Sequence, residues 1–247
     1  MPIVAADLKA FGSVNHAEDD TATQGGAISI VKRVEFTPLA ANDDLEVLSD
    51  NAADTMNMTL TGRNAAGAIV SETKALTGTT AAIFSTLGIV ERFLKGVLAS
   101  AAAGIITVRR SVAGATVATL EVGETEVRRL FYDSASESSL TTRHEKFFMK
   151  NDHATLTLTN AEIELTADPA ATIRIGGAPS VDDTATVANR KAAPASVTFV
   201  DDSVSQAVPG GDIAAASAIG IWAEMIRAAD APAIKDTFTV QLSGTTV

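Results

Sequence analysis

The sequence predicts an all-β protein, a β-sandwich or a jelly-roll-like fold. Thr and Val are frequent, and apolar and polar residues alternate over short runs, as they do in half-buried strands. Turn signals recur at about 8–12-residue spacing, which gives about twelve to fourteen short strands. No long 3.6-residue pattern of apolar residues occurs. The length of 247 residues allows one large β domain or two β modules in tandem.

The first 27 residues are predicted to form an extended N-terminal arm. They are polar, contain Glu18-Asp19-Asp20, and end in Gly25-Gly26. Because a chain end is ordered only where something holds it, we expect the arm 1–27 to order on a partner and not on its own domain.

A first β domain is expected over residues 28–150. Strict alternation around Met58 and Leu60, then the turn 62–67, predicts a hairpin that pairs 55–62 with 68–76. Residues 90–98 fit either a strand or a short helix. An apolar strand is expected to start in the run 143–151. The other strands expected in this domain are 28–36, 45–48, 105–110, 116–122 and 127–132.

A second β module is expected over residues 151–247, with the boundary placed at the polar turn near Asn151. Residues 219–227 fit a helix or a strand, and Gly220 in their interior favours the strand. The aperiodic polar stretch 180–195 is expected to be a long loop. The remaining expected strands are 155–158, 161–165, 172–175, 197–200 and 236–242.

Composition excludes several classes of function. The chain has no cysteine, which excludes disulfide scaffolds, thiolate metal sites and cysteine nucleophiles. A net charge of −11 repels phosphate backbones and anionic lipids, so we expect neither a nucleic-acid nor a membrane partner. No apolar run is long enough to cross a bilayer, and no signal peptide is expected at the start.

Charge is unevenly distributed along the chain. The stretch from Gly88 to Lys150 has nine basic and seven acidic residues, whereas the whole chain is strongly acidic. Two interpretations remain open: a solvated face with a chance excess of arginine, or an arginine-rich middle that faces an acidic neighbour.

Candidate chemical residues are few. His16, near Glu18-Asp19-Asp20, suits either a metal cluster or a solvated arm, and we expect the solvated arm. His144 precedes Glu145 without the HExxH spacing of a metalloprotease, and His153 is expected in a turn. Four loop pairs could contribute to calcium binding, but solubility is the simpler role: Asp19-Asp20, Asp43-Asp44, Asp182-Asp183 and Asp201-Asp202.

Signatures of enzymes are also missing. No GxSxG, Walker-type loop or GxGxxG occurs, and one Trp and one Tyr offer little for stacking sugars or bases. We therefore assign no catalytic, cofactor-binding or metal-binding residue and expect a protein that is not an enzyme.

Four segments resemble structural proteins of tailed bacteriophages, in particular capsid decoration (cement) proteins: EDDTATQGGAI, MTLTGRNAAGAIVSETKALTGTT, FFMKNDHATLTLTNAEIELTADP and GIWAEMIRAADAPAIKDTFTVQLSG. The resemblance implies an all-β virion protein, usually a homotrimer, made in the host cytoplasm and bound to the major capsid protein outside the phage head. An arm would reach a neighbouring subunit.

Three alternatives remain: a tail-tube, baseplate or fibre component; a bacterial surface adhesin, disfavoured by the missing signal peptide; and an enzyme on a β scaffold, disfavoured by the lack of a paired-carboxylate site.

Overall fold

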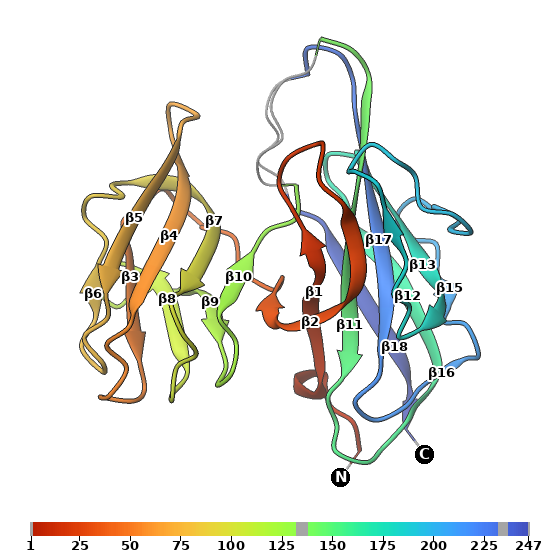
Figure 1. The fold of residues 1–247 in the computed structure, drawn as a ribbon, viewed down its shortest axis with the longest axis horizontal. Helices are drawn as coiled ribbons and strands as arrows, with labels where there is room; N and C mark the ends of the chain where they lie inside the picture. Colours follow the sequence, from red (N-terminus) through yellow and green to blue (C-terminus); the bar gives the residue numbers. More distant parts are fainter. Residues whose placement is uncertain (1, 132–137, 232–236, 247) are drawn as a thin grey trace. The chain divides into compact units, whose positions relative to one another are not determined.

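The computed structural model describes residues 2–131, 138–231 and 237–246. Apart from one 3-10 turn at Ala5–Asp7, the regular elements in these ranges are β-strands, which confirms the predicted all-β class. The chain divides into two compact units (Figure 1). Unit 1 contains residues 1–29 and 131–247, and unit 2 contains residues 30–130. No helix in the described ranges is long and apolar enough to cross a membrane.

Unit 1 is organised around two long antiparallel strands, β11 (Thr141–Asn151) and β17 (Ala218–Arg227). Beyond β17 lies β13 (Ile173–Val181), and beyond β11 lie β1 (Leu8–His16) and then β2 (Gln24–Arg33). Almost every residue of β17 is buried, which explains why its sequence lacks a clean two-residue alternation. The ambiguous segment 219–227 is therefore a strand.

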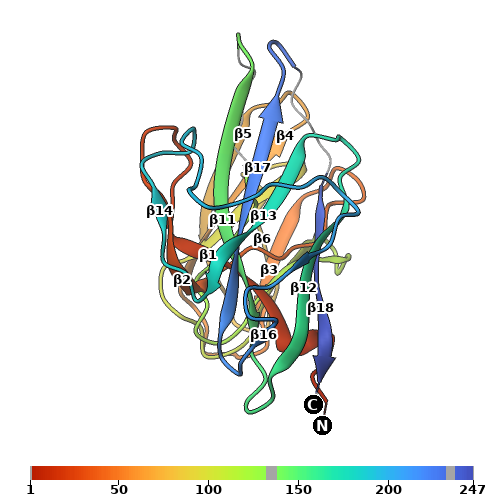
Figure 2. The same ribbon diagram turned by 90° about the vertical axis from the view of Figure 1, so that its right-hand side faces the viewer.

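A smaller sheet completes unit 1. Its central strand β12 (Leu158–Ala167) pairs with β18 (Thr239–Thr246) on one edge and with the short strands β15 (Gln206–Ala207) and β16 (Asp212–Ile213) on the other. Figure 2 shows β12 and β18 side by side. The two expected strands 155–158 and 161–165 are thus replaced by one.

The predicted N-terminal arm is wrong. β1 lies between β11 and β2 in the sheet, with Leu8 paired to Asn151 and Gly12 to Phe147. Phe11 is buried, and so are polar residues of the same stretch, including His16 and Gln24. Their polarity suggested a solvated segment, but inside the unit the His16 ring bonds to Glu145 and the Gln24 amide donates to the Ala17 carbonyl.

The expected division into 28–150 and 151–247 also differs from the structure. Asn151 ends β11 inside unit 1, and unit 2 is inserted between Ser29 and Phe131. Two chain segments far apart in sequence therefore build unit 1.

Unit 2 is a β-sandwich. One layer has the order β10 (Glu126–Arg128), β7 (Val90–Leu98), β4 (Asn57–Asn64), β5 (Ile69–Ala75), and the C-terminal end of β2 pairs in parallel with β10. The other has the order β6 (Ala82–Ile83), β3 (Leu45–Ser49), β8 (Ile106–Arg110), β9 (Thr116–Leu120). Leu45, Leu60, Phe93 and Val108 are buried in the core between them. The β4–β5 hairpin confirms the predicted pairing, and 90–98 is a strand.

Two predictions in the second half were incomplete. The expected loop 180–195 contains the short strand β14 (Thr186–Val187), which pairs with Gly25 and Gln24 of β2. The expected strand 197–200 is reduced to one isolated bridge, between Val200 and Ile175 of β13.

Candidate functional site

A cluster of charged groups lies inside unit 1 around Glu145 of β11, whose side chain is fully buried. One carboxylate oxygen lies 3.0 Å from the His16 Nε2 atom and accepts a hydrogen bond of 3.0 Å from the Phe131 backbone N–H. The other lies 2.8 Å from the Arg190 guanidinium, which is also buried. Glu145 therefore connects β1, the segment after β10, and the segment after β14.

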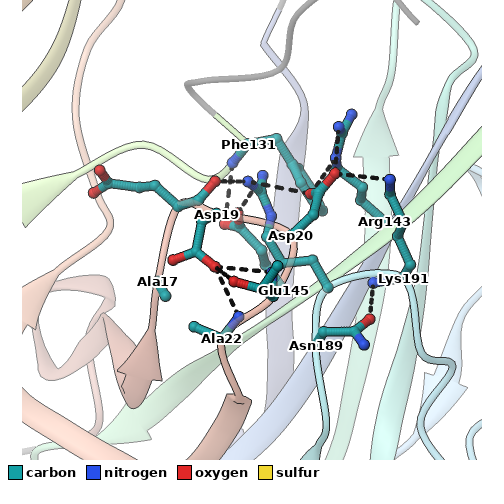
Figure 3. Close-up of polar contacts among 12 residues, drawn as sticks. Ala17, Asp19, Asp20, Ala22, Phe131, Arg143, Glu145, Asn189 and Lys191 are labelled. Atoms are coloured by element: carbon teal, nitrogen blue, oxygen red, sulfur yellow. Dashed lines mark hydrogen bonds and ion pairs between the residues drawn. The ribbon is translucent and has the colours of Figure 1, made fainter. Parts of the chain in front are cut away.

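A second carboxylate extends the cluster toward the surface (Figure 3). Asp20 accepts two hydrogen bonds of 2.8 Å from Arg143 of β11, in a bidentate arrangement, and lies 3.0 Å from the Lys191 ammonium. Arg190 also donates to the Glu18 carbonyl. Asp19 accepts hydrogen bonds from the Thr21 and Ala22 backbone. The β1–β2 connection, residues 17–23, is thus fixed to β11 by charge-assisted bonds.

The pKa of Asp20 lies well below its usual value because Arg143 donates to the carboxylate, with Lys191 helping, against a smaller opposing effect of burial. The folded state therefore binds a proton here less readily than the unfolded state. Asp20 stabilises the fold above the ordinary carboxyl pKa of about 4. That contribution disappears as the pH falls through the lowered pKa.

We expect Asp20→Asn to lower the urea midpoint of unfolding at pH 7. The gap between this variant and the wild type narrows as the pH falls below about 4. Urea titrations at several pH values test this, with the exposed Asp202→Asn as a control that removes one equal charge. A gap that stays constant with pH would contradict the assignment.

Two other basic side chains of β11 are enclosed on the opposite face. The His144 Nε2 atom lies 3.3 Å from Glu224 of β17, and its ring stacks at a tilt against Phe199. The buried Lys146 ammonium donates to Asp183, 2.6 Å away, and to the Gly26 carbonyl. Burial lowers the pKa of Lys146, and Asp183 opposes that shift. These groups hold neighbouring segments on the sheet, because each is bonded to a different strand or loop.

Of the three histidines singled out in the sequence, His16 is placed differently than expected. His16 lies inside the cluster and not in a solvated arm. Within the described ranges, no three His, Asp or Glu side chains come together in the manner of a metal site. His153 lies in the loop after β11, and its Nδ1 atom accepts backbone hydrogen bonds from Thr155 and Leu156.

The four Asp-Asp pairs have a role that sequence reasoning missed. One member of each pair forms an ion pair with a basic side chain: Asp20 with Arg143, Asp43 with Arg110, Asp183 with Lys146, and Asp201 with Arg174. These loop carboxylates compensate cations of the sheets. The sequence did contain one indication of such pairs, because the strand 143–151 has several charged residues. A buried strand can carry these charges only if other segments of the chain supply their partners.

The outer edge of unit 2's β5 is not paired with another strand in the described part of the chain. The bonds from Leu76 N–H to the Met56 carbonyl and from Asn64 N–H to the Ala68 carbonyl fix the alternation of the β4–β5 ladder. Even-numbered residues of β5 bond to β4, so the backbone groups of odd-numbered residues point outward. The odd-numbered residues are Ile69, Ser71, Thr73 and Ala75. In the described part of the chain, no other segment bonds to their outward-pointing backbone groups.

The two charged side chains of β5 are bonded to other segments of unit 2. Lys74 donates to the Ile83 carbonyl at 2.6 Å, and Glu72 accepts from the Leu87 N–H at 2.7 Å. The outward residues have exposed, uncharged side chains. By contrast, the β13 edge is bridged by Val200, and the Val117 carbonyl of β9 accepts from the Thr37 N–H.

Comparisons with known proteins give little. No protein-family model matches the chain, and no curated protein matches it. Among solved structures, a mutant VP2 protein of infectious bursal disease virus, from derived T=1 particles, aligns over 97% of this chain and 68% of its own. The sequence identity is 11% and the TM-score is 0.14.

Proposed function

We propose that the chain is a structural protein of a phage virion, a decoration protein that binds the outside of the head and stabilises the capsid lattice. The four segments that resemble decoration proteins support this role, and so does the all-β architecture in two units. A role without catalysis is supported by the use of His16, His144 and Lys146 as internal bonds of the sheet.

The open edge of β5 is the observation that carries the proposal. An exposed edge strand of seven residues is a template for pairing with another chain, and natural proteins usually guard it with charge, proline or a bulge. On β5 the two charged side chains, Glu72 and Lys74, bond within the unit, and β5 pairs with β4 without a bulge. An edge that is covered in the working assembly needs no guard.

The partner that we propose for this edge is an extended strand of the major capsid protein. Strand addition draws its affinity from main-chain hydrogen bonds, which requires little of the side chains on β5. Many copies on one lattice then add their weak contacts through multivalency. The predicted arm cannot supply this attachment, because residues 8–16 are already paired within unit 1. The homotrimer, the synthesis in the host cytoplasm and the position outside the capsid belong to the same proposal.

Co-sedimentation of the purified chain with capsids that lack it tests the role, and Thr73→Pro tests the edge. The Thr73 N–H points away from β4, so proline removes no backbone hydrogen bond of the hairpin, only the 2.7 Å hydroxyl contact with Thr59, but blocks an added strand. We expect the wild type to sediment with capsids and Thr73→Pro to lose at least tenfold in affinity, with an unchanged melting temperature.

The matched control is Ser71→Ala, which removes a hydroxyl from the same face and keeps every backbone group. It is expected to bind like the wild type. Binding by Thr73→Pro at wild-type affinity would exclude the β5 edge. Failure of the wild type to bind capsids, with rings or tubes in negative stain, would instead favour the tail-component alternative.

A further inference from the structure

Three arginines lie close together in unit 2, on the sheet that contains β4 and β7. Arg63 of β4 is directly opposite Arg92 of β7 in the ladder, and directly opposed residues project from the same face. Arg129 follows β10, and its backbone N–H donates to the Leu94 carbonyl of β7 at 2.9 Å. Two neighbours of β7 thus bring their arginines to the same stretch of this strand.

The positive charges of Arg63 and Arg129 differ in how they are compensated. Arg63 donates to Glu91 at 3.1 Å, and the Glu91 side chain is buried. The Arg129 guanidinium lies over the Phe36 ring, 4.6 Å from its centroid. Over the described ranges, no carboxylate lies within ion-pair distance of Arg129. Arg129 is only 8% exposed.

A buried cation without a counter-charge is costly, because desolvation is not offset by a partner. Burial, together with the positive charges of Arg92 and Arg63, lowers the pKa of Arg129 to about 9. The Arg129 guanidinium therefore remains a cation at pH 7, and the positive charges of Arg92 and Arg63 act on it. The ring of Phe36 supplies only a weak attraction.

We propose that Arg129, with Arg63 and Arg92, forms a binding site for an oxyanion, a phosphate or carboxylate group. Guanidinium groups bind both through paired N–H donors, and an anion here would supply the missing counter-charge. The anion has two possible sources, a dissolved ion or an acidic side chain of another copy of this acidic chain. This inference does not depend on the proposed role in the virion.

Calorimetric titration of the full chain with inorganic phosphate at pH 7, against sodium chloride at matched ionic strength, tests the site. We expect saturable binding by the wild type, a loss of at least tenfold in affinity in Arg129→Met, and an intermediate loss in Arg129→Lys. Arg110→Met is the matched control, since it removes an equal charge from an arginine that Asp43 already pairs. It is expected to bind phosphate like the wild type.

Sedimentation velocity in the two salts distinguishes the sources. If another copy supplies the carboxylate, the wild type is an oligomer in chloride that phosphate and Arg129→Met both dissociate. If a dissolved ion fills the site, phosphate binds without a change in mass. Equal phosphate responses of the wild type and Arg129→Met, or no response in either measurement, would overturn the proposal. So would binding that appears only after Asp133 and Glu137, outside the described residues, are changed to Asn and Gln.

Discussion

Glu145→Gln is expected to lower the free energy of unfolding of unit 1 by about 3–5 kcal/mol, the cost of removing one partner from a buried ion pair. The amide has nearly the volume of the carboxylate, so no cavity forms. What changes is charge: Arg190 and His16 both lie against the carboxylate with fully or almost fully buried side chains. The neutral amide removes the carboxylate that lies 2.8 Å from the Arg190 cation, in an environment that water does not reach.

The measurement is urea denaturation followed by the fluorescence of Trp222. This is the one tryptophan of the sequence, and it lies in β17, so its emission reports the unfolding of unit 1. The control is Glu162→Gln on β12, an exposed carboxylate that accepts a hydrogen bond from Ser205. It is expected to change stability by less than about 1 kcal/mol. A loss of similar size in both variants would show that the buried cluster is not a principal source of stability.

The strands that sequence reasoning predicted well are those with one buried and one exposed face. Met58 and Leu60 are buried while Asn57 is exposed, and that alternation fixed both the strand and its hairpin. The same reasoning failed for β1, where Ser13 and His16 occupy buried positions. A period-two pattern shows only where apolar and polar side chains alternate. A polar residue that is buried against a partner distant in sequence therefore looks like an exposed residue in such a pattern.

The charged cluster was hidden for a related reason. Its carboxylate, Glu145, is separated from His16 by 129 positions, and Arg190 lies in a stretch without any periodicity. Only the fold brings them together. The insertion of unit 2 into unit 1 was hidden as well, because nothing in the sequence near Ser29 or Phe131 marks where one unit is interrupted and resumed.

Gly25 is a backbone position in unit 1 where a single added methyl group is expected to be strongly destabilising. Its φ is +86°, and an added Cβ atom would lie 2.7 Å from the Trp222 ring and 2.8 Å from the Ala185 carbonyl oxygen. The carbonyl belongs to the backbone next to β14, which pairs with β2 at this residue, so neither neighbour can move without breaking other contacts. The left-handed conformation costs alanine about 1–2 kcal/mol. Overpacking adds about 1–3 kcal/mol.

Gly25→Ala is therefore expected to destabilise unit 1 by about 2–5 kcal/mol. Gly210→Ala is the matched control, since Gly210 lies in the same unit with a φ of +82° and no atom within 4 Å of an added Cβ. The Gly210→Ala variant is therefore expected to lose stability only through the left-handed backbone conformation of the alanine. The difference between the two urea midpoints, read from Trp222 fluorescence, isolates the steric contribution. Equal losses would mean that β2 and β14 shift apart easily, and that the N-terminal strands are held less firmly to unit 1 than their pairing indicates.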